Sequence, residues 1–264
     1  MAVLSCTHVQ KQYMSRVGIP MTAVKDFNLT LQHQEFFCLL GPSGCGKSTV
    51  LTMLAGFELP SRGDITLDGQ NITGPSRDRG MVFQGDDSLY PWLTALENIA
   101  FGLKLAGASP MAIREEAMGY LEMVGLSGQQ NKYPAELSGG MKQRIQIARA
   151  LAAKPKMLLM DEPFGALDAQ TRGVMQHQLR DIWHKTGSTV VFITHDIDEA
   201  IVLGSRVGIM TAGPGGTLKT TIDIDLGEQR SRSDPGYNAY YGRIESTIRE
   251  EVDKTYSIVR SSVA

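Results

Sequence analysis

Near the start of the chain, apolar and polar residues alternate over two stretches, residues 3–9 and 24–31. A period of two is typical of strands that bury one face. A short apolar run over residues 35–40 then ends at Gly41, and apolar residues at helical spacing follow over residues 50–55. We therefore expect a β-rich beginning in which one buried strand leads through a loop into a helix.

Residues 94–153 carry almost no strand pattern and several apolar stripes at helical spacing, which predicts a helical region. Dense apolar runs return at residues 157–160, 189–194 and 206–211, with helical segments between them. Strands that are apolar on both faces and alternate with helices favour a mostly parallel, buried sheet. Residues 227–236 are expected to form a linker to a final helix.

Composition adds limits to this picture. The chain has 264 residues, near the upper limit for one hydrophobic core, and its 26 basic and 28 acidic residues give a net charge of −2. A charge near zero disfavours binding to nucleic acid. The chain lacks an apolar run of the roughly 18 residues that span a bilayer, and its first residues lack a signal-peptide pattern. Three cysteines without a Cys-x-x-Cys pair fit a reducing compartment. Together these features lead us to expect a cytosolic protein that is soluble when isolated.

A glycine-rich segment after the buried strand fits the pattern G-x-x-x-x-G-K-[ST] of a phosphate-binding P-loop. It reads Gly41, Pro42, Ser43, Gly44, Cys45, Gly46, Lys47, Ser48 and then Thr49. Glycines let backbone N–H groups converge on phosphate oxygens, and the following helix directs its positive end at the same anion. We expect Lys47 to reach the β- and γ-phosphates of ATP and Ser48 to ligate Mg²⁺. The alternative is a strand-to-helix turn without a ligand.

The apolar run at residues 157–160 ends in two carboxylates, Asp161 and Glu162. A P-loop protein needs such an acidic element, called Walker B, to hold its metal ion. Asp161 would hold Mg²⁺ directly or through water, and Glu162 would polarise the attacking water as a general base. Two acids at the end of a strand can also be solvated loop residues.

A third segment, Leu137 to Arg144, places Ser138, Gly139 and Gly140 at the start of a predicted long helix. This is a second anion-binding helix N-terminus, and one nucleotide does not need two from one core. The segment resembles the signature motif of ATP-binding cassette (ABC) ATPases. The resemblance implies that these three residues face the γ-phosphate of an ATP molecule held by a second subunit.

Further motifs of the family follow in order along the chain, over about residues 3–215. By resemblance, Tyr13 stacks on adenine, Gln84 contacts the metal or the water, Asp168 belongs to the D-loop with Ala166 and Leu167, and His195 contacts the γ-phosphate. Tyr13 could instead be an ordinary edge aromatic, and His195 a structural histidine. Met141 and Gly165 depart from the common family residues, but neither position supplies phosphate, metal or the base.

The resemblance implies an α/β fold: a P-loop NTPase with a RecA-like core, an antiparallel β lobe and a helical signature lobe over about residues 87–150. Residues 1–232 would form the nucleotide-binding domain and residues 233–264 a helical tail. Two copies would close head to tail around two Mg²⁺–ATP molecules and reopen after hydrolysis. ATP and Mg²⁺ are the cofactors that this interpretation requires.

One cassette without a fused membrane span looks like the separate ATPase subunit of a bacterial importer. Residues 88–94, with Pro91 and Trp92, are similar to a segment of nitrate, sulfonate and taurine importers, and could dock a permease helix or simply form a turn. The implied partners are a second ATPase subunit, a transmembrane permease and a periplasmic or lipid-anchored solute-binding protein, with the chain at the cytoplasmic face of the membrane. The alternatives are an importer of another small solute and a soluble cassette protein acting on nucleic acid or ribosomes. A small-molecule kinase would have no use for the signature.

The end of the chain carries an apolar stripe of Ile244, Ile248, Val252 and Tyr256, which predicts an amphipathic helix over residues 237–257. Because every proposed phosphate or metal ligand precedes residue 196, we expect this helix to cover part of the β-rich core. A regulatory role or a dimer contact is the alternative.

Overall fold

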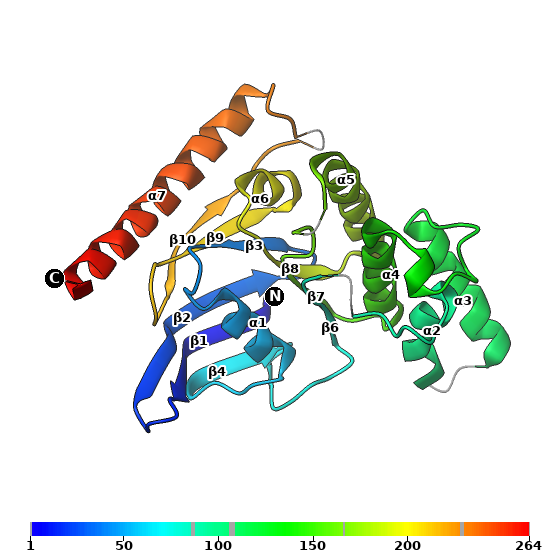
Figure 1. Ribbon diagram of the computed structural model, residues 1–264, viewed down its shortest axis with the longest axis horizontal. Coiled ribbons are helices and arrows are strands. Elements are labelled where there is room, and N and C mark those ends of the chain that lie inside the picture. The colour runs from blue at the N-terminus through cyan, green and yellow to red at the C-terminus, as the bar shows by residue number, and fades with distance from the viewer. Residues whose placement is uncertain (1, 86–87, 106–108, 166, 228–229, 264) are drawn as a thin grey trace. The chain divides into compact units, whose positions relative to one another are not determined.

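The computed structural model describes residues 2–85, 88–105, 109–165, 167–227 and 230–263 (Figure 1). The chain forms two compact units. The first combines Met1–Pro75 with Thr189–Ala264, and the second is Ser76–Ser188. The P-loop and His195 belong to the first unit, whereas Walker B and the signature belong to the second.

The first unit combines an antiparallel sheet, a mostly parallel sheet and helices. Its elements are β1 (Ala2–Met14), β2 (Pro20–Gln32), β3 (Phe36–Leu40), α1 (Lys47–Ala55), β4 (Arg62–Leu67), β5 (Gln70–Asn71), β8 (Thr189–Ile193), α6 (Ile197–Leu203), β9 (Arg206–Met210), β10 (Leu218–Asp223) and α7 (Pro235–Val263). The antiparallel strands lie in the order β2-β1-β4-β5, and the others in the order β10-β9-β3-β8. Strand β3 pairs in parallel with β8 and β9, while β10 pairs antiparallel with β9.

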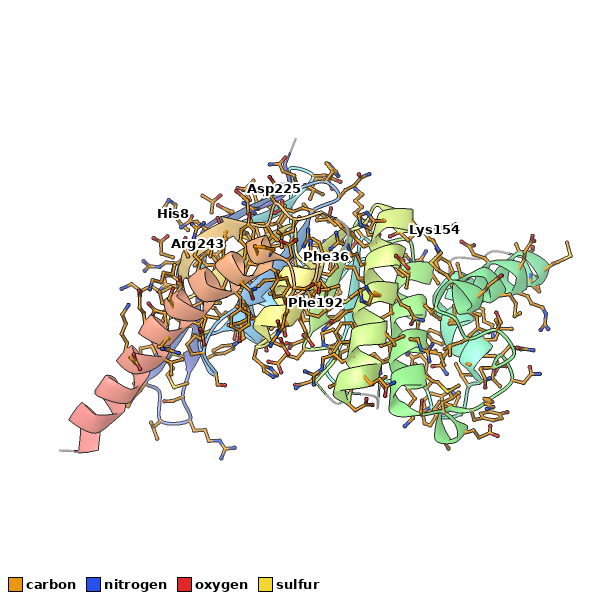
Figure 2. The ribbon with its side chains drawn as sticks, turned by 90° about the horizontal axis from the view of Figure 1, so that it is seen from above. His8, Phe36, Lys154, Phe192, Asp225 and Arg243 are labelled. Carbon is orange, nitrogen blue, oxygen red and sulfur yellow. The ribbon has the colours of Figure 1, made fainter. Side chains whose placement is uncertain are left out.

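The core of this unit confirms the predicted buried strands. Every residue of β3 and of β8 is buried, as expected for parallel strands covered on both faces. Phe36 and Phe192, on these neighbouring strands, place their ring centroids 5.8 Å apart (Figure 2). Strand β10 was not predicted, since only Ile222 in it is fully buried and its sequence carries no clear apolar run.

Strands β1 and β2 are longer than the alternation predicted, because they continue to a hairpin turn at residues 15–19. Ser15 N–H donates to the carbonyl of Ile19 at 2.9 Å and closes this turn. Near the turn, large side chains such as Val17 are exposed. The period-two pattern fades there because the end of the hairpin has no buried face to specify.

The second unit is mainly helical, as predicted for residues 94–153. Its elements are β6 (Arg79–Val82), α2 (Ala95–Leu105), α3 (Pro110–Met123), the short 3₁₀ helix η1 (Pro134–Glu136), α4 (Gly139–Ala152), β7 (Met157–Asp161) and α5 (Ala169–Thr186). Strands β6 and β7 pair in parallel, and α2, α3 and α4 pack on one another. The predicted stripes are buried, with Ile113, Ala117 and Leu121 on α3 and Ile145 on α4.

The final helix, α7, begins two residues earlier and ends later than the predicted 237–257. It packs against α6 and β9, where Ile244 is fully buried and Ile248 and Val252 are half-buried. The side chain of Tyr256 lies outside the described residues. Within the described part of the chain, the helices are too short or too polar to cross a membrane.

Candidate active site

The P-loop joins β3 to α1 and turns sharply through left-handed glycines. Gly44 and Gly46 have φ angles of 77° and 102°, and Gly46 is the residue that caps α1. A Cβ at Gly46 would lie 2.7 Å from the carbonyl oxygen of Ala23, so no side chain fits there. The first turn of α1 has N–H groups without partners inside the helix, and the loop before it turns at positions that require glycine. Together the loop and the helix form a suitable site for phosphate.

Lys47, the first residue of α1, extends its side chain back across the loop. Its ammonium group donates to the carbonyl oxygens of Gly41 at 2.7 Å and Pro42 at 2.9 Å, and the residue is 8% exposed. The positive charge is therefore held at the loop rather than in solvent. Ser48 is exposed next to it, as a metal ligand must be. Burial raises the pKa of the Cys45 thiol, so this residue of the loop is a small neutral side chain.

Tyr13 lies on β1, half-buried, with its hydroxyl held in place. The hydroxyl donates to Glu58 at 2.6 Å, and the ammonium group of Lys11 lies 5.1 Å from the ring centroid. Burial raises the pKa of Tyr13, the hydrogen bond to Glu58 raises it further, and a hydrogen bond to Thr49 lowers it. The contact with Thr49 brings Tyr13 to the helix that starts at the P-loop. The predicted aromatic and the predicted phosphate loop therefore meet in the first unit.

His195 lies two residues after the end of β8, and its side chain is exposed. The residues around it are fixed by short polar contacts. The hydroxyl of Thr194 donates to Glu199 at 2.5 Å, and the carboxylate of Asp196 caps α6 by accepting from the N–H groups of Asp198 and Glu199. The imidazole is thus carried on a rigid turn at the carboxyl end of a central parallel strand, where ligands of α/β sheets commonly bind.

In the second unit, the structure brings Gln84 and Glu162 together. The side-chain amide of Gln84 donates to a carboxylate oxygen of Glu162 at 3.4 Å. Glu162 has a φ angle of 42°, which is a strained, left-handed conformation for a residue with a Cβ. Asp161, the last residue of β7, is half-buried beside it. Strain of this kind is concentrated at functional sites.

The signature residues begin α4 as predicted. Ser138 is the N-cap, and its hydroxyl accepts from the N–H of Met141 at 3.4 Å. Gly140 packs so closely on α5 that an added Cβ would lie 3.1 Å from Cγ2 of Thr171. Asp168 caps α5 and also accepts from the hydroxyl of Thr171 at 2.7 Å. The signature and the D-loop are therefore neighbours, although Ala166 lies outside the described residues.

The hydrogen bonds that hold the segment at residues 88–94 in place were not predicted from the sequence. Asn98 is fully buried, and its side chain accepts from the N–H of Tyr90 and donates to the carbonyls of Tyr90, Leu93 and Thr94 at 2.9–3.2 Å. This rigid loop leaves the indole of Trp92 69% exposed. An asparagine inside an apolar helix was the available signal, because a buried amide must find hydrogen-bond partners.

Three contacts join the signature helix to Gly85 and to the segment at residues 88–94. Gln146 on α4 donates to the carbonyl oxygen of Gly85 at 3.0 Å, and the guanidinium of Arg149 lies 5.3 Å from the ring centroid of Tyr90. Arg149 also donates to the hydroxyl of Ser88 at 3.3 Å. The helix that begins at Ser138 therefore contacts the chain on both sides of residues 86–87.

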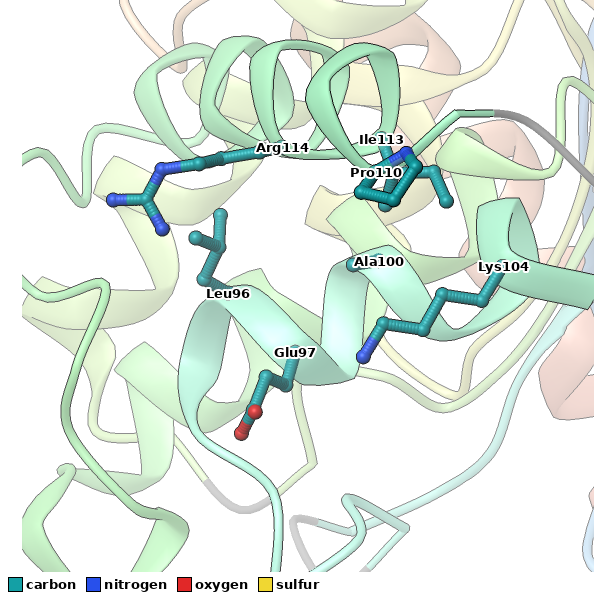
Figure 3. A pocket seen from close by; sticks show the side chains of 7 residues that line it. All are labelled: Leu96, Glu97, Ala100, Lys104, Pro110, Ile113 and Arg114. Atoms are coloured by element: carbon teal, nitrogen blue, oxygen red, sulfur yellow. The ribbon is translucent and has the colours of Figure 1, made fainter.

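A cavity of about 410 Å³ lies between α2 and α3 of the second unit (Figure 3). Its lining residues are Leu96, Glu97, Ala100, Lys104, Pro110, Ile113 and Arg114. Apolar side chains form part of its wall, while Lys104 and Arg114 add positive charge at its edges. Its first lining residue, Leu96, lies two positions after the exposed loop of residues 88–94, called the Trp92 loop below.

Within the described residues, no group of three or more His, Cys, Asp and Glu side chains could hold a metal ion by itself. The proposed donors Ser48, Gln84 and Asp161 are oxygen ligands, which Mg²⁺ prefers, and Mg²⁺ at nucleotide sites is usually held by one or two protein groups with the substrate phosphates. The residues present therefore fit a magnesium ion that arrives with its nucleotide.

The chain matches the family model described as ABC transporter over residues 24–165, and it is similar to proteins of known role. It is 43% identical to the nitrate import ATP-binding protein NrtD of Synechocystis over 97% of this chain and 98% of that protein. It is 44% identical to the bicarbonate transport ATP-binding protein CmpC of Synechococcus elongatus, over 91% of this chain but only 36% of that protein.

Solved structures agree with these relatives. The chain resembles the dimeric ATP-binding cassette MJ0796 bound to ADP and Pi, with a TM-score of 0.73 and 33% identity over 85% of this chain and all of that one. It also resembles cbiO1 of Clostridium perfringens, part of the transporter complex cbiONQ, with a TM-score of 0.75 and 26% identity over 84% of this chain and 89% of that one. The predicted P-loop NTPase fold is thereby confirmed. The chain belongs to the ABC transporter family, as an ATP-binding subunit that hydrolyses ATP.

Proposed function

We propose that this chain is the ATPase subunit of an importer for a small anion. The observation that carries the proposal is the full-length similarity to a nitrate import subunit, which is supported by the similarity to a bicarbonate transport subunit. Both solutes are small inorganic anions. Sulfonates carry the same negative charge on their acidic group, although taurine balances it with an ammonium group. The net charge of −2 argues against the alternative, a cassette protein acting on nucleic acid.

The residues of the P-loop have the chemistry to bind the phosphates of ATP. The backbone N–H groups of Gly44 and of residues 46–49 donate to phosphate oxygens. Lys47 supplies a positive charge to the β- and γ-phosphates, and Tyr13 stacks on adenine. Ser48, Gln84 and Asp161 would hold Mg²⁺, which when bound neutralises charge on the phosphates.

Glu162 is the proposed general base. Its carboxylate accepts a proton from the attacking water, while Gln84 holds the carboxylate in one orientation through the 3.4 Å hydrogen bond. The imidazole of His195 donates a hydrogen bond to the γ-phosphate, a contact that is lost once this phosphate has been cleaved off. Positioned general bases of this kind accelerate proton transfer by about 10²–10⁴-fold.

We also infer that ATP joins two copies of the chain. Ser138, Gly139 and Gly140 start α4 with unpaired N–H groups, and these donors suit the γ-phosphate held by the other copy. Asp168, held against the signature by Thr171, lies at the same surface of the second unit. The dimeric state of the similar cassette MJ0796 supports this arrangement.

The Trp92 loop and the neighbouring cavity between α2 and α3 are the proposed docking surface for a cytoplasmic helix of the permease. An indole that is 69% exposed on a loop fixed by Asn98 is a preorganised contact, and exposed aromatic residues are enriched at protein interfaces. The chain would thus reside at the cytoplasmic face of the membrane through its permease. A solute-binding protein, periplasmic or lipid-anchored, completes the proposed complex.

Reconstitution tests the function. The chain is co-purified with its permease and its binding protein, the complex is placed in liposomes, and ATP hydrolysis is measured with nitrate, bicarbonate, taurine or neutral sugars. We expect one small anion to stimulate hydrolysis and the Glu162→Gln complex to respond to none. Stimulation of ATP hydrolysis by a neutral sugar alone would show that the proposed class of solute is wrong.

A further inference from the structure

The short helix α6 follows His195 after a single intervening residue, Asp196. It has seven residues, and isolated helices of this length are unstable in water. Its stability, and with it the conformation of the turn that carries His195, must therefore come from contacts with other parts of the first unit.

Those contacts come from residues 230–237, just before and at the start of α7. The hydroxyl of Tyr237 donates to Oδ1 of Asp198 at 2.6 Å, and Arg232 donates through Nε at 2.9 Å and through Nη2 to the same carboxylate. Asp198 lies in the first turn of α6, three residues after His195. A bidentate arginine and a buried tyrosine thus hold the amino-terminal end of this helix.

The other end of α6 is held by the same segment. Arg230 donates to the carbonyl oxygens of Ile201 at 2.7 Å and of Gly204 at 2.5 Å, where the helix would otherwise leave carbonyl groups unpaired. Residues of the predicted linker, together with Tyr237, therefore bind both ends of the helix that follows His195. Residues 230–234 do lead into the final helix as predicted, but Arg230 and Arg232 also bind α6, about thirty residues earlier in the chain.

The pKa shifts of Asp198 and Tyr237 agree with the close contacts among Asp198, Arg232 and Tyr237. Burial alone would raise the pKa of Asp198, but the hydrogen bonds from Arg232 and Tyr237 hold it below its ordinary value. Burial, together with the hydrogen bond to Asp198, raises the pKa of Tyr237. Tyr237 is 1% exposed, so its hydroxyl makes its hydrogen bond to the carboxylate of Asp198 instead of to water.

We propose that Arg232 and Tyr237 are positioning residues for ATP hydrolysis: they act through Asp198 and α6 to hold the turn that presents His195. The proposal rests on the role of His195 at the γ-phosphate given above. The C-terminal segment is then part of the hydrolytic machinery, in addition to covering the core. Loss of either contact lets α6 fray and lets the imidazole leave its position, while the P-loop remains intact.

The far end of the tail provides a matched control. There Glu251 accepts from the N–H of Ala212 at 3.0 Å and forms ion pairs with Lys219 at 2.8 Å and with Lys254 at 2.6 Å. Lys219→Met removes a polar contact between the tail and the sheet, as Arg232→Ala removes one between the tail and α6. Only the second change touches the helix next to His195.

The test measures kcat, the KM for ATP and hydrogen exchange of residues 194–204 in the full chain, for Arg232→Ala, Tyr237→Phe, Arg232→Lys and Lys219→Met. We expect Arg232→Ala to lower kcat by about tenfold with KM changed less than about twofold, because misplacement of a catalytic group costs turnover more than binding. Exchange at residues 194–204 should accelerate, Tyr237→Phe should act in the same direction, and Arg232→Lys should recover part of both effects.

Three results would overturn the proposal: unchanged exchange at residues 194–204, unchanged kcat despite faster exchange, or an equal loss of kcat in Lys219→Met. The variant His195→Ala separates the proposal from the function on which it rests. If His195→Ala hydrolyses ATP at the normal rate while Arg232→Ala is impaired and exchanges faster, the role of His195 is wrong but the tail still positions the turn.

Discussion

Gln84 and Glu162, 78 residues apart in the chain, are joined by a 3.4 Å hydrogen bond from the amide to the carboxylate. The contact exists because Gln84 follows β6 and Glu162 follows β7, and these strands are parallel neighbours whose carboxyl ends meet at one edge. Gln84 also precedes the loop that exposes Trp92. The proposed base and the proposed permease contact are therefore connected through a few residues of one unit.

Replacing Glu162 with glutamine should stop hydrolysis and spare binding. The substitution keeps the shape of the side chain and removes its basicity, so we expect turnover to fall by about 10²-fold or more while ATP affinity stays within a few fold. Steady-state hydrolysis and titration with a fluorescent ATP analogue measure the two effects. Glu116→Gln, which alters an acid near Lys154, is the control, and a normal rate in Glu162→Gln would remove it as the base.

The glycines of the P-loop should differ in their tolerance of a methyl group. Gly46→Ala places Cβ against the carbonyl of Ala23 in a left-handed conformation, so we expect it to lose about 2–4 kcal/mol of stability together with ATP binding. At Gly44, which has nothing within 4 Å, the same change should cost only about 1 kcal/mol. Urea denaturation distinguishes the two, and equal losses would contradict the close approach at Gly46.

Dimer formation should depend on ATP. The Glu162→Gln protein should be monomeric without nucleotide and dimeric with ATP, because the γ-phosphate would bind Ser138 of the second copy. Light scattering after size exclusion reports the mass. In the double variant with Ser138→Arg the dimer should be absent, whereas Ser109→Arg, at the cap of α3, should leave it intact. A mass that never changes with ATP would contradict the closed pair.

Stability should fall in acid through Glu251. Burial alone would raise the pKa of this carboxyl, but hydrogen bonds from Lys219, Lys254 and the Ala212 N–H lower it to about 2. A carboxyl whose pKa is depressed in the folded state stabilises the protein above its unfolded pKa, and this stability is lost as the pH falls through the folded pKa. For Glu251 the window extends from about pH 4.5 down to about pH 2, and at most about 3 kcal/mol is lost there.

The measurement is urea denaturation at several pH values between 6 and the acid limit of folding. Glu251→Gln should be less stable than the natural chain at pH 6, and the difference should shrink as the pH falls. Other carboxylates titrate in both proteins, so the difference between the two curves isolates Glu251. A difference that is constant with pH would show that the charge of Glu251 is not what stabilises the tail.

Substitutions at Trp92 and Asn98 should have different effects, the first on binding to the permease and the second on folding stability. Trp92→Ala should change stability by less than about 0.5 kcal/mol and leave basal hydrolysis intact, because the indole is 69% exposed, yet it should weaken binding to the permease. Asn98→Ala should instead cost about 2 kcal/mol or more, since it leaves buried backbone groups without partners. Val174→Ala, which is 53% exposed on α5 and lies outside the proposed docking surface, is the control for pull-down with the permease.

The local chemistry of this protein could be predicted from its sequence. The P-loop depends on glycines at fixed spacing that lead into a helix, and the signature depends on Ser138 as an N-cap, so both are properties of short segments. The fully buried strands β3 and β8 were likewise predicted, because a continuous apolar run has few alternatives. The resemblance to a family was needed for the other assignments to the nucleotide, those of Tyr13, Gln84 and His195.

The tertiary structure decided what depends on partners far apart in the chain. The left-handed Glu162, the amide of Gln84 against it and the buried Asn98 beneath Trp92 each need a neighbour that no local pattern specifies. The same holds for Arg232, in the predicted linker over residues 227–236, and for Tyr237, at the start of the predicted final helix, because no local pattern shows that both bind Asp198. Periodicity reports which face of an element is apolar, whereas a hydrogen bond between distant side chains is set by how the elements pack, and only the folded chain shows that.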